Sequence, residues 1–389
     1  MIKLRKTIYS VIYLLTGIFT LSGCIERYEA DIAAEDSKLL VVEGTICSSK
    51  ESKFVLSRSQ SIGSYDVPRM VTDAAVSVRG SDGSKYEAKF VGGYYSCKTG
   101  ALSPDVEYAL HIEADGEVYE SDPQKPIRTE EIEAVIGVQD TPESDIDVLI
   151  TPAVPFNPDQ VNYYSWTYDE TWEVRPECTT SVYFDTQRKK PVVKHDLFPE
   201  RGWKDATGEA ILVGESQNYE GHHIQKLKLY DIGRNSYRLF YKYSGMIHQR
   251  AISKAEYEYE LARRQASSEM GGLFTPQPST LPTNIRCLTS GKHVIGYVGC
   301  SLNIAEYRFF FSPKDYSIVY PQLTDSRKWV EDITIEECCN MVNRGWFLCE
   351  WQDPQNSMNG KLRTAWALES QLDVRYNGAY IVKPDYWQD

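Results

Sequence analysis

The sequence of 389 residues has few of the features that mark catalysis or nucleic-acid binding. It has no H-E-x-x-H, P-loop, nucleophile-elbow or dinucleotide-binding glycine pattern, so no local motif supports an enzyme. Positive charge is in deficit, with 42 Lys and Arg against 55 Asp and Glu. The formal net charge of −13 would repel a phosphate backbone. We therefore expect a non-enzymatic protein with no cofactor and no nucleic-acid partner.

Metal-binding patterns are also lacking. No two cysteines have the C-x-x-C spacing, so the sequence supports neither a zinc knuckle nor a thioredoxin-type redox site. Of the six histidines only His222 and His223 are adjacent, and neighbours on a strand point to opposite faces. We expect no metal site. Catalytic triads and carboxylate pairs can assemble from distant residues, so a hydrolase stays open as an alternative.

Long hydrophobic runs are absent apart from one near the N-terminus. Ile8 to Thr20 is an apolar run of about 13 residues, shorter than the roughly 20 that a membrane-spanning helix needs. Three basic residues precede the run, and Leu21-Ser22-Gly23-Cys24 follows it at once. This pattern is typical of a lipoprotein signal peptide, which is removed before the cysteine.

The pattern predicts a lipid-anchored protein. Residues 1–23 form the signal peptide, and the Cys24 thiol is the lipid attachment site at the start of a polar tether, residues 24–36. The acyl chains would hold the protein on a membrane without crossing it. Acidic residues after the anchor resemble the surface-export signal of Bacteroidota lipoproteins: Glu26, Glu29 and Asp31. We expect an outer-membrane location that faces the cell surface, with the periplasmic face as the alternative.

Cysteine is plentiful after the anchor. The eight are Cys47, Cys97, Cys178, Cys287, Cys300, Cys338, Cys339 and Cys349. Exported proteins meet an oxidising environment, so we expect disulfides. Cys47 and Cys97 share one β-rich segment and are the first predicted pair, and Cys349 could bond to Cys338 or Cys339. The alternative is that the thiols are free and buried as small apolar side chains.

The fold is expected to be mainly β. Residues 37–128 contain short β-branched runs separated by turn residues, including Asp-Gly at 82–83 and at 115–116, and Asp-Gly favours a hairpin. This spacing predicts an N-terminal immunoglobulin-like or carboxypeptidase-regulatory-like β-sandwich. Prolines and an acidic stretch mark a boundary near Thr129. Residues 129–389 would form a larger β-rich domain with one or two short helices.

The segment Tyr163 to Val174 alternates aromatic and polar residues, which predicts a long strand with one aromatic face. Its aromatic side chains could contact a ligand or pack in a core, and core packing is favoured: Tyr164, Trp166, Tyr168 and Trp172. Two helices are expected from capping boxes. Ser253 with Glu256 begins one that ends at Gly271-Gly272, and Thr334 with Glu337 begins a shorter one that ends at Gly345.

Several segments together resemble a known family. They are Val42-Glu43-Gly44, Tyr164-Ser165-Trp166, Glu170 to Glu173, Ile252 to Tyr257, Gly271 to Pro278, Pro282 to Ile285, Val294 to Val298, and Lys383 to Trp387. The sequence resembles the Bacteroidota lipoproteins called domain of unknown function 4249. The resemblance implies an outer-membrane lipoprotein that accompanies a TonB-dependent receptor, with no catalytic residues to carry over. Many members have a cysteine pair where this chain has Gln371 and Val374, so any crosslink there is absent or made by other cysteines.

These observations predict an outer-membrane lipoprotein of unknown ligand, acting as a non-enzymatic binding or accessory component of a TonB-dependent nutrient-uptake complex. One alternative is a structural or adhesive cell-surface module, in which Trp166 and Trp172 would be buried and no concave aromatic cleft would exist. The other is a surface hydrolase with two converging carboxylates or a Ser/His/acid set.

Overall fold

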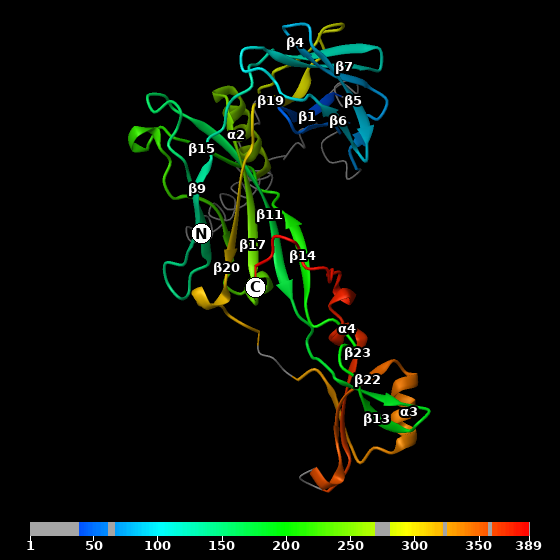
Figure 1. The fold of residues 1–389 in the computed structure, drawn as a ribbon. Coiled ribbons are helices and arrows are strands. Elements are labelled where there is room, and N and C mark those ends of the chain that lie inside the picture. Colours follow the sequence, from blue (N-terminus) through cyan, green and yellow to red (C-terminus); the bar gives the residue numbers. More distant parts are fainter. Residues whose placement is uncertain (1–38, 61–66, 269–280, 322–324, 357–359, 389) are drawn as a thin grey trace, which may run out of the picture.

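The structure is a computed structural model that describes residues 39–60, 67–268, 281–321, 325–356 and 360–388. Cys24, the predicted signal peptide and the predicted tether lie outside these residues. The described chain is mainly β, as expected from the sequence. Figure 1 shows an elongated molecule of three parts, which we call the N-terminal, central and distal modules. The N-terminal and distal modules lie at opposite ends.

The N-terminal module is a sandwich-like, ten-stranded sheet with its own core. Its strand order is β18-β8-β7-β4-β5-β6-β2-β1-β19, and β3 pairs with β2 outside this path. The strands are β1 (Leu40–Cys47), β2 (Glu51–Arg58), β3 (Arg69–Met70), β4 (Ala75–Gly80), β5 (Lys85–Val91), β6 (Tyr94–Lys98), β7 (Tyr108–Ala114), β8 (Glu117–Ser121), β18 (Ile285–Cys287) and β19 (Val294–Ser301).

Two strands of this sheet come from late in the sequence. β19 pairs in parallel along the whole of β1, and β18 pairs with β8. Gly296 of β19 lies so close to β1 that a Cβ atom there would be 1.9 Å from the Val42 carbonyl oxygen. The segment 37–128 therefore shares its sheet and its core with residues 285–301, which the sequence interpretation assigned to the C-terminal domain.

The turn at Asp115-Gly116 forms as expected. It joins β7 to β8, with Ala114 opposite Glu117, and both turn residues have positive φ. This is the geometry that a two-residue hairpin requires and that Asp-Gly favours.

The predicted Cys47–Cys97 disulfide is wrong, because β2 lies between the two strands that carry these cysteines. Two strand spacings of about 4.8 Å place them roughly 9–10 Å apart, beyond the roughly 7 Å that a disulfide can span. Both thiols are free and buried. Burial raises the pKa of Cys97 to about 11, and Cys97 packs in the core as a small apolar side chain.

The central module packs a three-stranded and a five-stranded sheet around one core. The orders are β16-β10-β9 and β14-β11-β17-β20, with β15 also paired to β11. The strands are β9 (Ile132–Val138), β10 (Ile146–Pro152), β11 (Tyr163–Val174), β14 (Gly202–Thr207), β15 (Leu212–Glu215), β16 (Leu227–Ile232), β17 (Tyr243–Ile252) and β20 (Ala305–Phe311). The bounds of β11 coincide with the strand predicted from its aromatic alternation.

Helix α2 (Lys254–Ser268) follows β17 and lies between the N-terminal and central modules in Figure 1. Its start is as predicted, because the Ser253 hydroxyl accepts a hydrogen bond from the Glu256 amide at 3.1 Å. The predicted stop at Gly271-Gly272 lies outside the described residues.

The distal module consists of the hairpin β12 (Val182–Asp185) and β13 (Lys190–Val193), a sheet of order β21-β23-β22, and helix α3 (Ile335–Asn343). The sheet strands are β21 (Lys328–Glu331), β22 (Trp346–Gln352) and β23 (Arg363–Leu368). The short helix α4 (Glu369–Leu372) follows β23. A small third core lies here, so the larger predicted C-terminal domain holds two separate cores.

The connection between the N-terminal and central modules is built from buried polar contacts. The Thr129 amide donates to the Asn303 side chain, and the Asn303 amide group donates to the Thr129 carbonyl, both at 2.9 Å. Arg250 pairs with Glu256 at 2.6 Å beside Gly299, where a Cβ atom would lie 2.5 Å from the Glu256 carboxylate. The residues around the predicted boundary are therefore packed between the two modules.

Candidate functional site

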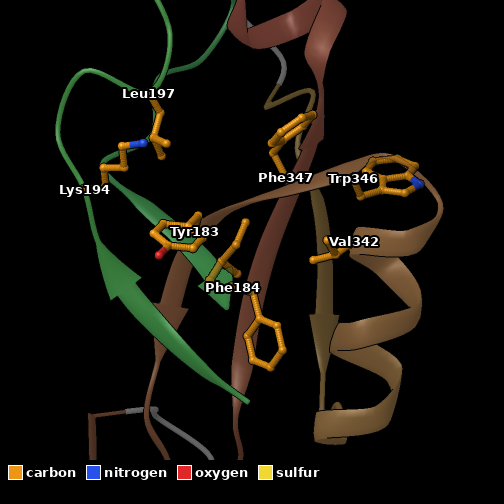
Figure 2. Close-up of a pocket in the computed structure, with 8 residues that line it drawn as sticks. Tyr183, Phe184, Lys194, Leu197, Val342, Trp346 and Phe347 are labelled. Atoms are coloured by element: carbon orange, nitrogen blue, oxygen red, sulfur yellow. The ribbon is translucent and has the colours of Figure 1, made fainter. Parts of the chain in front are cut away.

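The candidate site is an apolar pocket of about 280 Å³ in the distal module. Figure 2 shows that two walls face each other across it, with Lys194 and Leu197 on one side and Val342, Trp346 and Phe347 on the other. The lining residues are Tyr183, Phe184, Lys194, Leu197, Val342, Trp346, Phe347 and Leu348. The volume is just below the roughly 300–1,000 Å³ that is typical of ligand pockets.

The first wall is the β12–β13 hairpin and the segment after it. Asp185 shapes its turn, because the carboxylate accepts hydrogen bonds from the Gln187 and Arg188 amides, both at 2.9 Å. The bond from the Arg188 amide lowers the pKa of Asp185. The Lys194 amide donates to the Ser181 carbonyl at 2.9 Å, which holds Lys194 beside the hairpin.

The second wall is α3 and the start of β22. The capping box predicted from the sequence forms here: the Thr334 hydroxyl accepts from the Glu337 amide, and the Glu337 carboxylate accepts from the Thr334 amide at 2.8 Å. That backbone bond lowers the pKa of Glu337. Gly345 has a φ of 81° and ends the helix, so the chain turns directly into Trp346 and Phe347 of β22.

The chemistry of the lining suits binding. Phe347 is held by an edge-to-face contact with Phe198, with ring centroids 5.0 Å apart. The lining offers one ammonium group, on the exposed Lys194, and one phenol, on Tyr183, among otherwise apolar side chains. Such a pocket can enclose an aromatic or branched apolar group, and Lys194 adds one positive charge to its lining.

The four residues predicted as ligand contacts do not lie here. Tyr164, Trp166 and Trp172 of β11 are at most 4% exposed, and Tyr168 packs partly buried against the same core. They are core side chains, so the alternative that the sequence favoured is correct. The physical reason is that the sheet β16-β10-β9 covers the aromatic face of β11.

Hydrogen bonds to buried polar groups hold the side chains of this aromatic face in place. The Trp166 indole donates to the Gln249 side chain at 2.9 Å, and the Tyr164 hydroxyl donates to Glu130 at 3.1 Å. Glu170, on the same face, is 3% exposed and accepts hydrogen bonds from Arg238 at 2.5 Å and from Tyr243 at 2.8 Å. These contacts satisfy the carboxylate inside the protein, so Glu170 serves the central core.

The histidine pair forms no shared site. His222 contacts the Ser216 carbonyl at 3.2 Å, and His223 contacts the Pro152 carbonyl at 2.8 Å. Within the described ranges, no group of three or more His, Cys, Asp or Glu side chains is placed to hold a metal ion.

Sequence reasoning missed every residue of the pocket. A usable signal was the apolar run Trp346-Phe347-Leu348 directly after a short capped helix, which indicates a buried or ligand-facing strand. No local signal pairs that run with the distant Tyr183 to Leu197 segment.

The chain matches the model of a known protein family. The model of the family described as "domain of unknown function (DUF4249)" matches residues 25–305. The chain belongs to the DUF4249 family. The DUF4249 match includes the N-terminal module, nearly all of the central module's strands and the first wall of the pocket, and it ends before α3 and β22. No curated protein matches the chain. Among the described helices, none has the length and apolarity to span a membrane.

Proposed function

We propose that this protein is a lipid-anchored, non-enzymatic binding protein of the outer membrane, and that it is an accessory component of a nutrient-uptake complex with a TonB-dependent receptor. The observation that carries the binding role is the open apolar pocket of the distal module. The lipobox that ends at Cys24 and the resemblance to DUF4249 lipoproteins support the membrane role.

The position of the pocket fits a tethered protein. The described chain begins at the N-terminal module, and the pocket lies in the module at the opposite end (Figure 1). An anchor at Cys24 would hold the N-terminal module near the lipid surface. The distal module would then present its pocket away from the membrane, where a nutrient or a receptor loop can reach it.

The lining defines the ligand class. Aromatic and aliphatic walls favour a flat or branched apolar group, since burial of apolar surface contributes about 25 cal/mol per Å². Lys194 favours a ligand that also carries a carboxylate, sulfonate or phosphate. We therefore propose an apolar anion as the natural cargo.

Co-purification tests the membrane role. The full-length protein, tagged at its C-terminus, is extracted from native outer membranes with mild detergent, and the partners are identified by mass spectrometry. We expect a TonB-dependent receptor in stoichiometric amount. The matched control is Cys24→Ala, which we expect in the soluble fraction without the receptor. Isolation of the lipidated protein as a lone monomer would contradict the role in uptake.

A fluorescent apolar anion tests the binding role independently. 1-Anilinonaphthalene-8-sulfonate should bind the folded protein with increased fluorescence and one-to-one saturation, and excess apolar anion should compete. A protein that shows no saturable binding, or that binds the dye equally well when the pocket is filled by Val342→Phe, does not use this pocket.

A structural or adhesive module is the second candidate. The burial of Trp166 and Trp172 favours it, since both side chains serve the central core. It predicts no receptor and no saturable dye binding, so the two experiments above separate the candidates.

A further inference from the structure

Two cysteines lie close to the place where the two walls of the pocket are joined. Cys178 lies in the segment between β11 and the β12 hairpin, and Cys349 lies on β22 beside the lining residue Leu348. The Thr180 hydroxyl donates to the Leu348 carbonyl at 2.8 Å, which holds the Cys178 segment along β22. Cys178 and Cys349 therefore lie in adjoining segments, and each thiol shifts the pKa of the other.

A β-bulge gives Cys349 this position. Leu348 lies opposite Trp366 and Glu350 lies opposite Ala365, so Cys349 is the extra residue between them. A bulge turns the side chain of its extra residue away from the regular alternation of the strand. On the other side, the Cys178 amide donates to the Gln371 carbonyl at 3.2 Å, which fixes Cys178 against the segment that follows β23.

The surroundings assign different roles to the two thiols. The neighbouring Cys349 thiol and the charge of Arg327 lower the pKa of Cys178, which is partly exposed. The neighbouring Cys178 thiol and burial raise the pKa of Cys349. Arg327 is itself held beside the pair by Asp325 at 2.8 Å and Glu350 at 3.2 Å. Cys178 is therefore the thiol that reacts first, because the thiolate is the nucleophile.

We propose that Cys178 and Cys349 form a disulfide that ties the two walls of the pocket together. The oxidant is a disulfide, either of a thiol–disulfide exchange protein or of a small thiol compound. The Cys178 thiolate attacks one sulfur of that disulfide and releases the other as a thiolate. Cys349 then gives up its proton, attacks the Cys178 sulfur and releases the second thiolate. The two protein thiols lose two electrons and two protons, and the oxidant becomes two thiols.

The crosslink would stabilise the distal module. It joins residues that are far apart in sequence, and closing a long loop in the unfolded chain is where a disulfide stabilises most. It would also fix the hairpin wall relative to β22. This bond does not depend on the identity of the ligand or the receptor, and it requires only an oxidising compartment, which the proposed lipoprotein location supplies.

The test uses the purified full-length protein, equilibrated with oxidised and reduced glutathione and then blocked with N-ethylmaleimide in denaturant, which exposes the buried thiols. Digestion without reductant should yield one crosslinked peptide pair containing Cys178 and Cys349, while the other six cysteines after Cys24 are alkylated. Oxidation should raise the melting temperature by roughly 5 °C. Cys178→Ser, Cys349→Ser and the double variant should all lose this rise equally, and the matched control Cys339→Ser should keep it.

Two results would overturn the proposal. One is full alkylation of both Cys178 and Cys349 after oxidation. The other is a crosslink from Cys349 to Cys338 or Cys339. If a variant fails to fold, the peptide map of the unmutated protein still decides the question. Because the readout is a peptide and a melting temperature, its failure is distinguishable from absence of the receptor or of dye binding.

Discussion

The central and distal modules each contain a cluster of aromatic side chains. The cluster of the central module is part of a core, whereas that of the distal module lines a pocket. On β11 the aromatic face is covered by a second sheet, and Trp166 is 1% exposed. In the distal module Trp346 and Phe347 are only partly covered, and a pocket of about 280 Å³ remains beside them. Aromatic content alone therefore does not identify a binding surface. What decides is whether another layer of the fold packs against it.

The largest expected effect on stability is in the covered aromatic cluster of β11, which we call the closed cluster; the partly covered cluster at Trp346 and Phe347 is the open cluster. Trp166→Ala should lower the free energy of unfolding by about 3–5 kcal/mol, since it opens a cavity and leaves the buried Gln249 amide without its indole partner. Chemical denaturation followed by circular dichroism measures this. The matched variant Trp346→Ala in the open cluster should lower the free energy of unfolding clearly less. Equal losses in the two variants would mean that the two clusters are packed alike.

The next effect is in the open cluster. Val342→Phe should fill the pocket and lower the affinity for 1-anilinonaphthalene-8-sulfonate at least about tenfold, or about 1.4 kcal/mol. Stability should change little, because the added ring enters existing space. Val154→Phe, at a residue 65% exposed in the central module, is the control and should leave dye affinity unchanged. Unchanged affinity in Val342→Phe would place the dye elsewhere.

A smaller effect concerns the helix that forms one wall of the pocket. Thr334→Ala should destabilise α3 by about 1 kcal/mol, because it removes the side-chain cap. Amide hydrogen exchange of α3 measures the change. The pKa of Glu337 is lowered from its ordinary 4.5 by the Thr334 amide, so its contribution is present above pH 4.5 and is lost as the pH falls through the lowered value.

Amide hydrogen exchange of α3 should therefore also depend on pH. Protection of α3 in the wild-type protein should weaken as the pH falls below 4.5, and Glu337→Gln should flatten that dependence. Equal protection of α3 above and below pH 4.5 would show that the capping box does not stabilise this helix.

The smallest effect tests the charge at the pocket mouth. Lys194→Met should weaken binding of 1-anilinonaphthalene-8-sulfonate about two- to fivefold, since exposed charge pairs contribute about 0.2–1 kcal/mol. The neutral dye N-phenyl-1-naphthylamine should bind both proteins equally. Added salt should shrink the difference for the anion. A loss of equal size for both dyes would mean that the Lys194 side chain acts by packing.

Local features of the fold were predictable because neighbouring residues determine them. The alternation along β11, the Asp115-Gly116 turn and the Thr334 capping box each depend on a few adjacent side chains, and each is confirmed. The Cys47–Cys97 prediction failed because it assumed that residues in one β segment are neighbours. Strand order decides that, and β2 lies between them.

The candidate site could not be predicted for a related reason. Its first wall lies at Tyr183 to Leu197 and its second at Val342 to Leu348, and only the packing of α3 and β22 against the β12 hairpin brings them together. The proposed Cys178–Cys349 disulfide has the same origin, because the bulge at Cys349 and the bond from Thr180 both depend on distant partners.

The sequence by itself determined the mainly β fold, the local caps and turns and the DUF4249 membership, and it predicts the lipid anchor at Cys24. These depend on residue patterns within short segments. The tertiary structure alone decided which aromatic face is covered, where a pocket stays open and which cysteines lie in adjoining segments. Those depend on non-local contacts, since a side chain is buried by whatever part of the chain packs against it.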